Sequence, residues 1–353
     1  MIKKPTGRNS WDIRDYREGD EIGMNDLFNT VFKLQRPLGH WAWKFEKNPL
    51  APNKYICLAE KDQKILAMYP CLPSYFNYFS DRCVVLQAVD NCVHEDVRKG
   101  LKREGVFLKT LKGLIQQAVR KGCDFGFGFP TDEHFRYGEK KLGYTHVWKL
   151  PVMQKSLPGA EDRGGSTGRR IWSGLKKMIR EEEKLFSVSE VAEFNSGFDQ
   201  LWKKVVPDYK IAMERNAEFL NWRYIINPMG EYKCLAVHER GERIPRGYVV
   251  GQVKGGEVQR GQIFDFLLHG PRPAGLALLE RLEDFFLAAG AKVVECRMFE
   301  HVPMYDILFA SGFRPAPDAI NVNAFLFNAE KISNIELGRK ENWHLTLGDS
   351  DTE

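Results

Sequence analysis

The sequence predicts an α/β protein made of two tandem domains, each a mixed, mostly antiparallel sheet flanked by helices. Three observations support this. The chain has 353 residues, more than one hydrophobic core usually organises. Residues 156–170 are rich in Gly, Ser and charged residues, which is the composition of a linker. The stretches before and after that linker repeat one another in the same order.

Four pairs of short motifs carry the repeat. They are WKFEKNP and WRYIINP (residues 43–49 and 222–228), CLA and CLA (57–59 and 234–236), GCD and GAK (122–124 and 290–292), and LGY and SGF (142–144 and 311–313). Differences in loop length between two copies of one fold explain the slowly changing spacing. We therefore expect an N-terminal domain at 1–155, a C-terminal domain at 171–330, and a surface tail at 331–353 anchored by Trp343.

Each copy is expected to contain the same elements in the same order. Proline ends a Trp-containing helical turn, apolar residues at helical spacing mark a long amphipathic helix, and glycine caps a short helix. The first copy contains a helix at 18–32, strands at 55–60, 65–72 and 86–93, a helix at 106–120, a strand at 124–129, a helix ending at Gly143 and a strand at 145–153. The second contains a helix at 190–205, strands at 232–239, 247–253 and 262–269, a helix at 275–289, a strand at 292–298, a helix ending at Gly312 and a strand at 319–327.

Composition argues against several classes of protein. The net charge of +5 falls well short of a basic nucleic-acid-binding stripe, so we expect no nucleic-acid partner. The seven cysteines form no C-x-x-C pair and the histidines have no ligand spacing, so we expect no metal site and a reducing compartment. The chain shows no signal-peptide h-region and no apolar stretch of about 18 residues. These features predict a cytoplasmic protein without a membrane span.

A phosphate-binding loop is expected between the strand at 87–93 and the helix that begins at Val106. A helix N-terminus offers unpaired backbone N–H groups and a partial positive charge. Gly100 and Gly105 permit close approach of a pyrophosphate. Four basic residues surround this end: Arg98, Lys99, Lys102 and Arg103.

The loop sequence VHEDVRKGLKREGVF resembles the phosphate-loop segment of the GNAT acetyltransferase superfamily, with a short insertion. Gly105 matches the family signature, Lys102 stands where Arg or Gln is expected, and Phe107 replaces a small residue. The wider frame, YREGDE, HWAWKFEKNP, GFGFP and KKLGY, resembles the bilobed, tandem subgroup of that superfamily. The resemblance covers most of residues 12–155 and, more loosely, 185–328.

This resemblance implies an N-acyltransferase that uses acetyl-CoA or another acyl-CoA as co-substrate. The implied acceptor is a small-molecule amine, such as an amino sugar of polysaccharide biosynthesis. Two alternatives stay open: a GNAT-fold binding or scaffold protein without catalysis, and an aminoacyl or acyl transferase that uses a carrier other than CoA. The acceptor, the acyl chain length and the oligomeric state are not readable from the sequence.

The resemblance places the CoA site in the first copy. The segment from Arg272 to Ala277 fits the family signature better, but Pro271 and Pro273 remove N–H donors and the basic cluster is missing there. The opposite assignment stays open. The implied CoA-binding residues are Cys92, Val93, Arg98, Lys102, Arg103, Glu104, Gly105, Val106 and Phe107.

The resemblance also implies two catalytic residues. Asp90 follows from the family's habit of taking its base from this strand, with Asn91 as a helper. The family's acid is a Tyr, but that position holds Glu139, so the nearby Tyr137 is the candidate. Each has a structural alternative: Asp90 as a solvated or capping carboxylate, and Tyr137 as a residue packed on the sheet.

Overall fold

A computed structural model of the chain describes residues 11–98, 105–158, 185–256 and 258–351. The chain divides into two compact units. Unit 1 comprises Met1–Phe76, Arg82–Val147 and Asn323–Gly338, and unit 2 comprises Asn77–Asp81, Trp148–Val322 and Arg339–Glu353. The units follow the two predicted halves except that each takes short segments from the other half. Most of the predicted linker lies outside the described residues.

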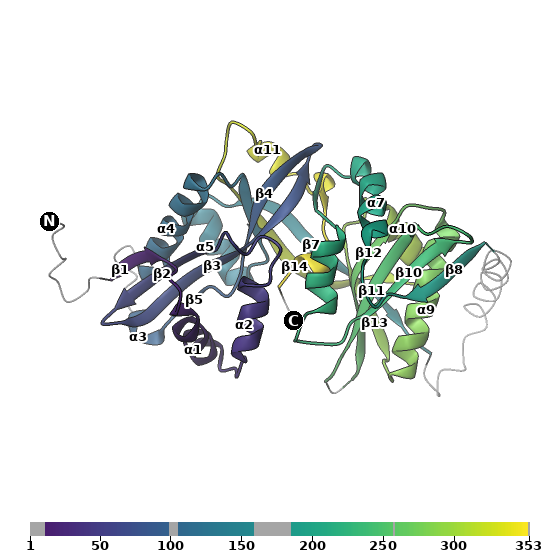
Figure 1. The fold of residues 1–353 in the computed structure, drawn as a ribbon, viewed down its shortest axis with the longest axis horizontal. Coiled ribbons are helices and arrows are strands. Elements are labelled where there is room, and N and C mark those ends of the chain that lie inside the picture. Colours follow the sequence, from purple (N-terminus) through teal and green to yellow (C-terminus); the bar gives the residue numbers. More distant parts are fainter. Residues whose placement is uncertain (1–10, 99–104, 159–184, 257, 352–353) are drawn as a thin grey trace. The chain divides into compact units, whose positions relative to one another are not determined.

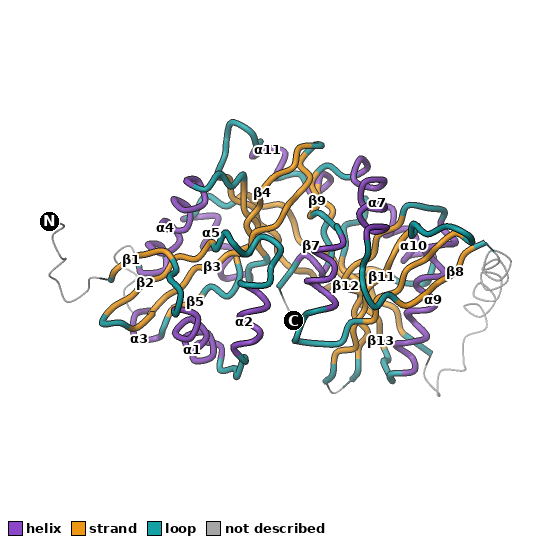
Figure 2. Tube along the Cα trace, viewed as in Figure 1, coloured by secondary structure: helices purple, strands orange, loops and turns teal. Residues whose placement is uncertain are grey.

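Unit 1 is a sheet with helices packed against it (Figures 1 and 2). Its strands follow the order β1-β2-β3-β4-β6, with the end of β14 next to β6. The β1–β2 and β2–β3 pairs are antiparallel and the β4–β6 pair is parallel. Its elements are β1 (Asp12–Asp15), α1 (Asp20–Phe32), α2 (Leu38–Phe45), β2 (Tyr55–Lys61), β3 (Lys64–Tyr78), β4 (Asp81–Ala88), β5 (Cys92–Val93), α3 (Glu95–Arg98), α4 (Val106–Arg120), β6 (Phe125–Gly128), α5 (Asp132–Lys141) and α11 (Asn334–Leu337).

Unit 2 has the same kind of sheet, in the order β8-β10-β11-β12-β13-β7. Here β12 and β13 are parallel, and the neighbouring pairs along the sheet are antiparallel. Its elements are β7 (Thr145–Ser156), β8 (Phe186–Glu190), α7 (Ser196–Val205), β9 (Ile211–Met213), α8 (Ala217–Leu220), a π-helical turn (Asn221–Ile225), β10 (Lys233–Glu239), β11 (Gly247–Lys254), β12 (Arg260–Leu268), α9 (Arg272–Ala288), β13 (Val293–Arg297), α10 (Pro303–Ala310), β14 (Arg314–Leu326), β15 (Trp343–His344) and the 3-10 turn η4 (Leu347–Asp349). The predicted fold class, α/β with mixed, mostly antiparallel sheets, is confirmed.

The two halves of the chain exchange their last strands. In unit 2, β7 from the first half pairs with β13, with Met153 opposite Cys296. In unit 1, the end of β14 pairs with β6, with Phe325 opposite Gly126. A Cβ on Gly126 would lie 2.2 Å from Cε2 of Phe325, so this close approach requires glycine. Each strand was predicted, but its partner was not.

Two predicted elements need correction. The strand expected at 86–93 is broken, because β4 ends at Ala88 and β5 starts at Cys92. The helix expected at 190–205 begins only at Ser196, after the N-cap residue Asn195. An Asn side chain that accepts a hydrogen bond from Gly197 N–H satisfies a free donor at that helix end.

Residues 342–350 of the predicted surface tail are buried, so the prediction of a surface position is wrong for them. Trp343, His344, Thr346 and Asp349 are each at most 1% exposed. Trp343 and His344 form β15, which pairs in parallel with β9. The apolar residues of this segment therefore remove their surface from water within unit 2, and the charge of Asp349 is neutralised there by an ion pair.

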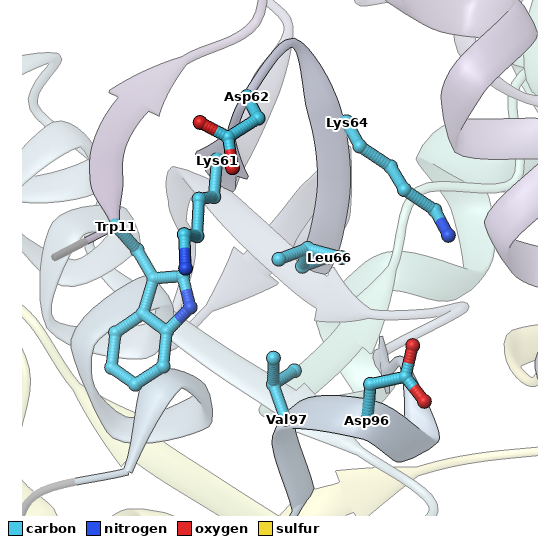
Figure 3. A pocket seen from close by; sticks show the side chains of 7 residues that line it. All are labelled: Trp11, Lys61, Asp62, Lys64, Leu66, Asp96 and Val97. Atoms are coloured by element: carbon cyan, nitrogen blue, oxygen red, sulfur yellow. The ribbon is translucent and has the colours of Figure 1, made fainter. Parts of the chain in front are cut away.

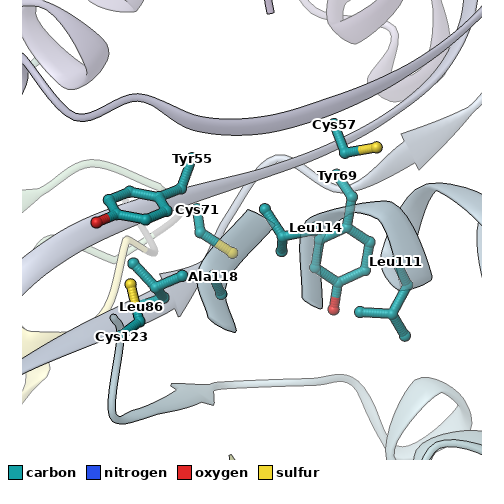
Figure 4. Close-up of a cluster of buried hydrophobic side chains, with 9 residues drawn as sticks. All are labelled: Tyr55, Cys57, Tyr69, Cys71, Leu86, Leu111, Leu114, Ala118 and Cys123. Atoms are coloured by element: carbon teal, nitrogen blue, oxygen red, sulfur yellow. The ribbon is translucent and has the colours of Figure 1, made fainter. Parts of the chain in front are cut away.

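The core of unit 1 determines where α4 lies. Figure 4 shows α4 and the neighbouring strands contributing nine side chains to one cluster: Tyr55, Cys57, Tyr69, Cys71, Leu86, Leu111, Leu114, Ala118 and Cys123. α4 spans the predicted residues, with its apolar face on β1 and β2. All seven cysteines are free and buried. Burial of this face anchors the helix, so its N-terminus has a defined position beside β5.

Candidate functional site

The backbone is irregular between the end of β4 at Ala88 and the start of β5 at Cys92. The register of β4 with β6 ends at Gln87 opposite Phe127. Asp90 then adopts φ 51°, an uncommon left-handed conformation for a residue with a side chain. On either side of it, the N–H groups of Val89 and His94 still donate to β3 carbonyls. Among the described strands, β5 pairs with β3.

α4 lies beside β5. Gly105 is its N-cap residue, and no side chain of the described region caps it. The side chain of Val106 packs into the core with Ala59 and Ala67, so only its backbone N–H is available to a ligand. Phe107 lies in the same way against Tyr69, with ring centroids 5.5 Å apart.

Several predicted CoA-binding residues cannot be placed. Lys102, Arg103 and Glu104, with Lys99 and Gly100, lie outside the described residues. Arg98 ends α3, but its side chain is also outside the described part. Of the remaining candidates, Cys92 is buried in β5 and Val93 is half-buried. The structure therefore brings together the backbone of Cys92, Val93, Gly105, Val106 and Phe107.

Asp90 is the centre of a buried ion cluster. Its Oδ2 accepts from Arg36 Nη1 at 2.5 Å, and its Oδ1 accepts from Lys44 Nζ at 2.8 Å. The side chains of all three residues are at most 4% exposed. Lys44 belongs to α2 and Arg36 to the connection between α1 and α2, so the cluster ties that connection to the strand break.

Two asparagines of α1 position Arg36. Asn25 accepts from Arg36 Nε at 2.9 Å and donates to the Arg36 carbonyl. Asn29 accepts from the Arg36 N–H at 2.7 Å. The guanidinium lies over the ring of Phe28, 3.6 Å from its centroid. α1 therefore determines where the guanidinium points, and α1 is a predicted element.

The environment of Asp90 makes it a weak proton acceptor. Burial by itself would raise the pKa of the carboxyl, but the charges of Lys44 and Arg36 outweigh burial and lower that pKa. Each oxygen already accepts a hydrogen bond from a cation. The assignment of Asp90 as a catalytic base stays a prediction, as does Tyr137, which lies on α5 with its side chain outside the described part.

Unit 2 contains a corresponding cluster that sequence reasoning missed. Arg215 Nε donates to Asp265 Oδ2 at 3.1 Å, and Arg215 Nη2 donates to Asp349 Oδ2 at 2.7 Å. Tyr248 and Tyr224 also donate to Asp265. The signal was available in the repeat, because Arg215 and Arg36 stand seven residues before the paired residues Trp222 and Trp43.

The tail of unit 2 lies against the irregularity in β12. The β11–β12 register shifts between Val250 and Gly251, which leaves Phe264 as an extra residue. A Cβ on Gly348 would lie 3.1 Å from the Phe264 carbonyl oxygen. Arg223 donates to the carbonyls of Gly348 and Ser350. The place that corresponds to the strand break of unit 1 is therefore occupied in unit 2.

One pocket lies beside this region of unit 1, with a volume of about 470 Å³ (Figure 3). It is lined by Trp11, Lys61, Asp62, Lys64, Leu66, Asp96 and Val97. Two lysines and two aspartates balance its charge, so its lining does not mark it for an anion. None of the predicted catalytic or CoA-binding residues lines it.

Two kinds of feature are absent from the described residues. They contain no group of three or more His, Cys, Asp or Glu side chains that could hold a metal ion. They also contain no helix with the length and apolar character needed to cross a bilayer.

Comparison with known proteins finds likeness in structure and not in sequence. No family model matches the chain, and no curated protein matches it. A GCN5-related N-acetyltransferase from Anabaena variabilis is 10% identical with a TM-score of 0.65, over 91% of this chain and 74% of that one. A probable N-acyltransferase from Enterococcus faecalis is 11% identical with a TM-score of 0.64, over the same shares.

Saccharomyces cerevisiae N-myristoyltransferase, solved with bound myristoyl-CoA, is 11% identical with a TM-score of 0.55. That match covers 92% of this chain and 85% of the yeast enzyme. At these identities the likeness establishes the fold, which the phosphate-loop motif had predicted. The chain therefore has the GNAT fold, the fold of the GCN5-related N-acetyltransferases.

Proposed function

We propose that the protein is an acyl-CoA-dependent N-acyltransferase that acts on a small amine, with an amino sugar as one candidate acceptor. The fold supports this proposal, since two of its structural neighbours are N-acyltransferases by name and a third is a probable N-acyltransferase. The observation that carries it within the chain is the irregular backbone at Asp90, between β4 and β5, beside α4 and its N-cap glycine. The pantetheine arm would lie along Cys92 and Val93, and the pyrophosphate at Gly105 and Val106.

We place the CoA site in unit 1. In unit 2 the buried tail lies against β12, and Pro271 and Pro273 stand at the start of α9 without N–H groups. Unit 1 offers an N-cap glycine followed by residues with free N–H groups. Acetyl-CoA and longer acyl-CoA molecules are both candidates for the co-substrate.

The proposed reaction needs three steps at the thioester. The acceptor nitrogen forms a C–N bond with the thioester carbon, the C–S bond breaks, and CoA leaves as the thiolate. The amine proton passes to a base and the thiolate takes up a proton. Asp90 would contribute by holding Arg36 and Lys44 in place, and Tyr137 remains the candidate proton donor.

Thermal unfolding with acyl-CoA tests the proposal. Acetyl-CoA and myristoyl-CoA at about 100 times Kd should stabilise the protein by about 2.7 kcal/mol. Gly105→Glu places a carboxylate at the proposed pyrophosphate site and should abolish the shift. Gly255→Glu is the matched control, because a side chain at either glycine meets no atom within 4 Å. A protein that no acyl-CoA stabilises would contradict the proposal.

An inactive binding protein with this fold is the second candidate. The weak basicity of Asp90 is the observation that favours it. CoA binding without release of free thiol in the presence of any amine would support this alternative.

A further inference from the structure

Each unit contains a buried arginine at the corresponding position, and the two arginines differ in their partners. In both, an arginine ahead of a Trp-containing helix binds an aspartate at the irregularity of the neighbouring strand: Arg36 with Asp90, and Arg215 with Asp265. Arg215 holds a second carboxylate, because its Nη2 also donates to Asp349 of the tail. Arg36 contacts one carboxylate only among the described residues.

The spare nitrogen of Arg36 is a buried donor without a partner. Within the described part of the chain, Nη2 of Arg36 makes no hydrogen bond, and the side chain is 3% exposed. An unpaired buried N–H of a cation costs free energy, about 1–3 kcal/mol or more. In unit 2 the equivalent donor, Arg215 Nη2, is paired with the carboxylate of Asp349 in the C-terminal tail. The chemistry that fits Arg36 Nη2 is therefore a carboxylate.

We infer that Arg36 binds a carboxylate of the acceptor, so that the acceptor is an amine that also carries a carboxylate. This inference rests on the proposed function. Asp90 lies two residues before Cys92, along whose backbone the pantetheine arm is proposed to lie. Because Arg36 pairs with Asp90, a group held on Arg36 lies near the backbone along which the pantetheine arm is proposed to lie.

The residues around Arg36 indicate how such a ligand reaches it. Phe32, Leu34 and Leu38 are large apolar side chains that are 45%, 54% and 44% exposed. They border Arg36 on the α1–α2 connection, where Lys33 has φ 56°. A ligand whose carboxylate binds Arg36 would place its apolar part near these three exposed side chains. An acceptor with an apolar portion as well as a carboxylate fits best.

The first test compares matched acceptors with the wild-type protein. L-leucine and L-leucinamide differ in the carboxylate, which also raises the pKa of the α-amine, so their rates are compared at equal concentrations of the unprotonated amine. D-glucosamine and its 6-carboxylate counterpart differ at C6. Release of free thiol from acetyl-CoA measures transfer. A charge-assisted bond to buried Arg36 predicts a kcat/KM about 10- to 100-fold higher for the acid of a pair. Equal values, or a preference for the uncharged member, would overturn the inference and leave the proposed function intact.

The second test changes the arginine. Arg36→Lys keeps a cation for Asp90 but removes the second nitrogen of the fork. It should raise KM for the carboxylate acceptor about 10-fold or more, and by clearly more than it raises KM for the amide. Arg14→Lys is the control, because Arg14 also binds two partners through its guanidinium, Asp20 and Glu60. An equal loss with both acceptors would refute a role in carboxylate binding.

A binding measurement separates this inference from the proposed function. The probe is 4-methylpentanoate, which is leucine without its amine, with 4-methylpentanamide as its uncharged match. The carboxylate should raise the Tm of the wild type and not of Arg36→Lys, even if no amine is acylated. Binding of this kind without transfer would sustain the site and refute the acyltransferase. No shift, together with equal use of acid and amide acceptors, would refute the site.

Discussion

The buried pair between Arg215 and Asp349 predicts a large loss of stability when the tail loses one carboxylate. Both side chains are 0% exposed, and Asp349 also accepts from the Thr346 N–H at 2.7 Å. Asp349→Ala leaves part of the Arg215 charge buried without its partner. Removing one member of a buried ion pair costs about 3–5 kcal/mol. For a unit of this size, that corresponds to a fall in Tm of about 6–20 °C.

Differential scanning calorimetry measures this change, with Asp318→Ala as the matched control. Asp318 also pairs with an arginine, Arg297, but it is 62% exposed. Exposed pairs of this kind contribute about 0–1 kcal/mol. Similar small shifts for both variants would show that the tail is not docked on Arg215 and would remove the comparison with Arg36.

Three further predictions concern packing and pH. Gly126→Ala should lower the free energy of unfolding in urea by about 1–3 kcal/mol, because the new Cβ overlaps the ring of Phe325. Adding Phe325→Leu should restore part of that loss. An unchanged urea midpoint in Gly126→Ala would argue against the pairing of β14 with β6. Burial and the charge of Arg215 hold the pKa of His344 well below its usual value. Below about pH 6.5 the unfolded state therefore binds more protons than the folded state. The free energy of unfolding then falls by up to about 1.4 kcal/mol for each unit by which the pH decreases. His344→Phe keeps the stacking on Tyr209 and should flatten this slope, whereas a slope as steep as that of the wild type would assign it to other groups. Because the pKa of Asp90 is lowered in the folded state, its contribution to stability is fully present above about pH 4 and is lost as the pH falls through the folded pKa. Asp90→Asn should therefore remove this loss of stability at acid pH, which equilibrium unfolding at pH 2–5 measures.

Local patterns were enough to predict most of the elements. The helix of α4 was predicted at its observed bounds, because its apolar residues recur at helical spacing and its ends carry their own signals. The Asn-Pro ends of the two Trp helices and the C-cap glycines Gly143 and Gly312 are local as well. The break at Asp90 was missed, since the strand pattern continues through residues 86–93 and only the contacts of Asp90 with Arg36 and Lys44 favour the irregular backbone.

The sequence alone determined the kind of fold, the order of its elements and the resemblance on which the proposed chemistry rests. Those are properties of short segments: periodicity, caps, proline stops and a loop motif. The tertiary structure decided which strand closes each sheet, that the tail is buried, and that Asp90 is an ion-paired carboxylate. Those depend on residues far apart in the chain, such as Phe325 with Gly126 and Asp349 with Arg215, and a strand or a charge looks the same in sequence whichever partner it finds.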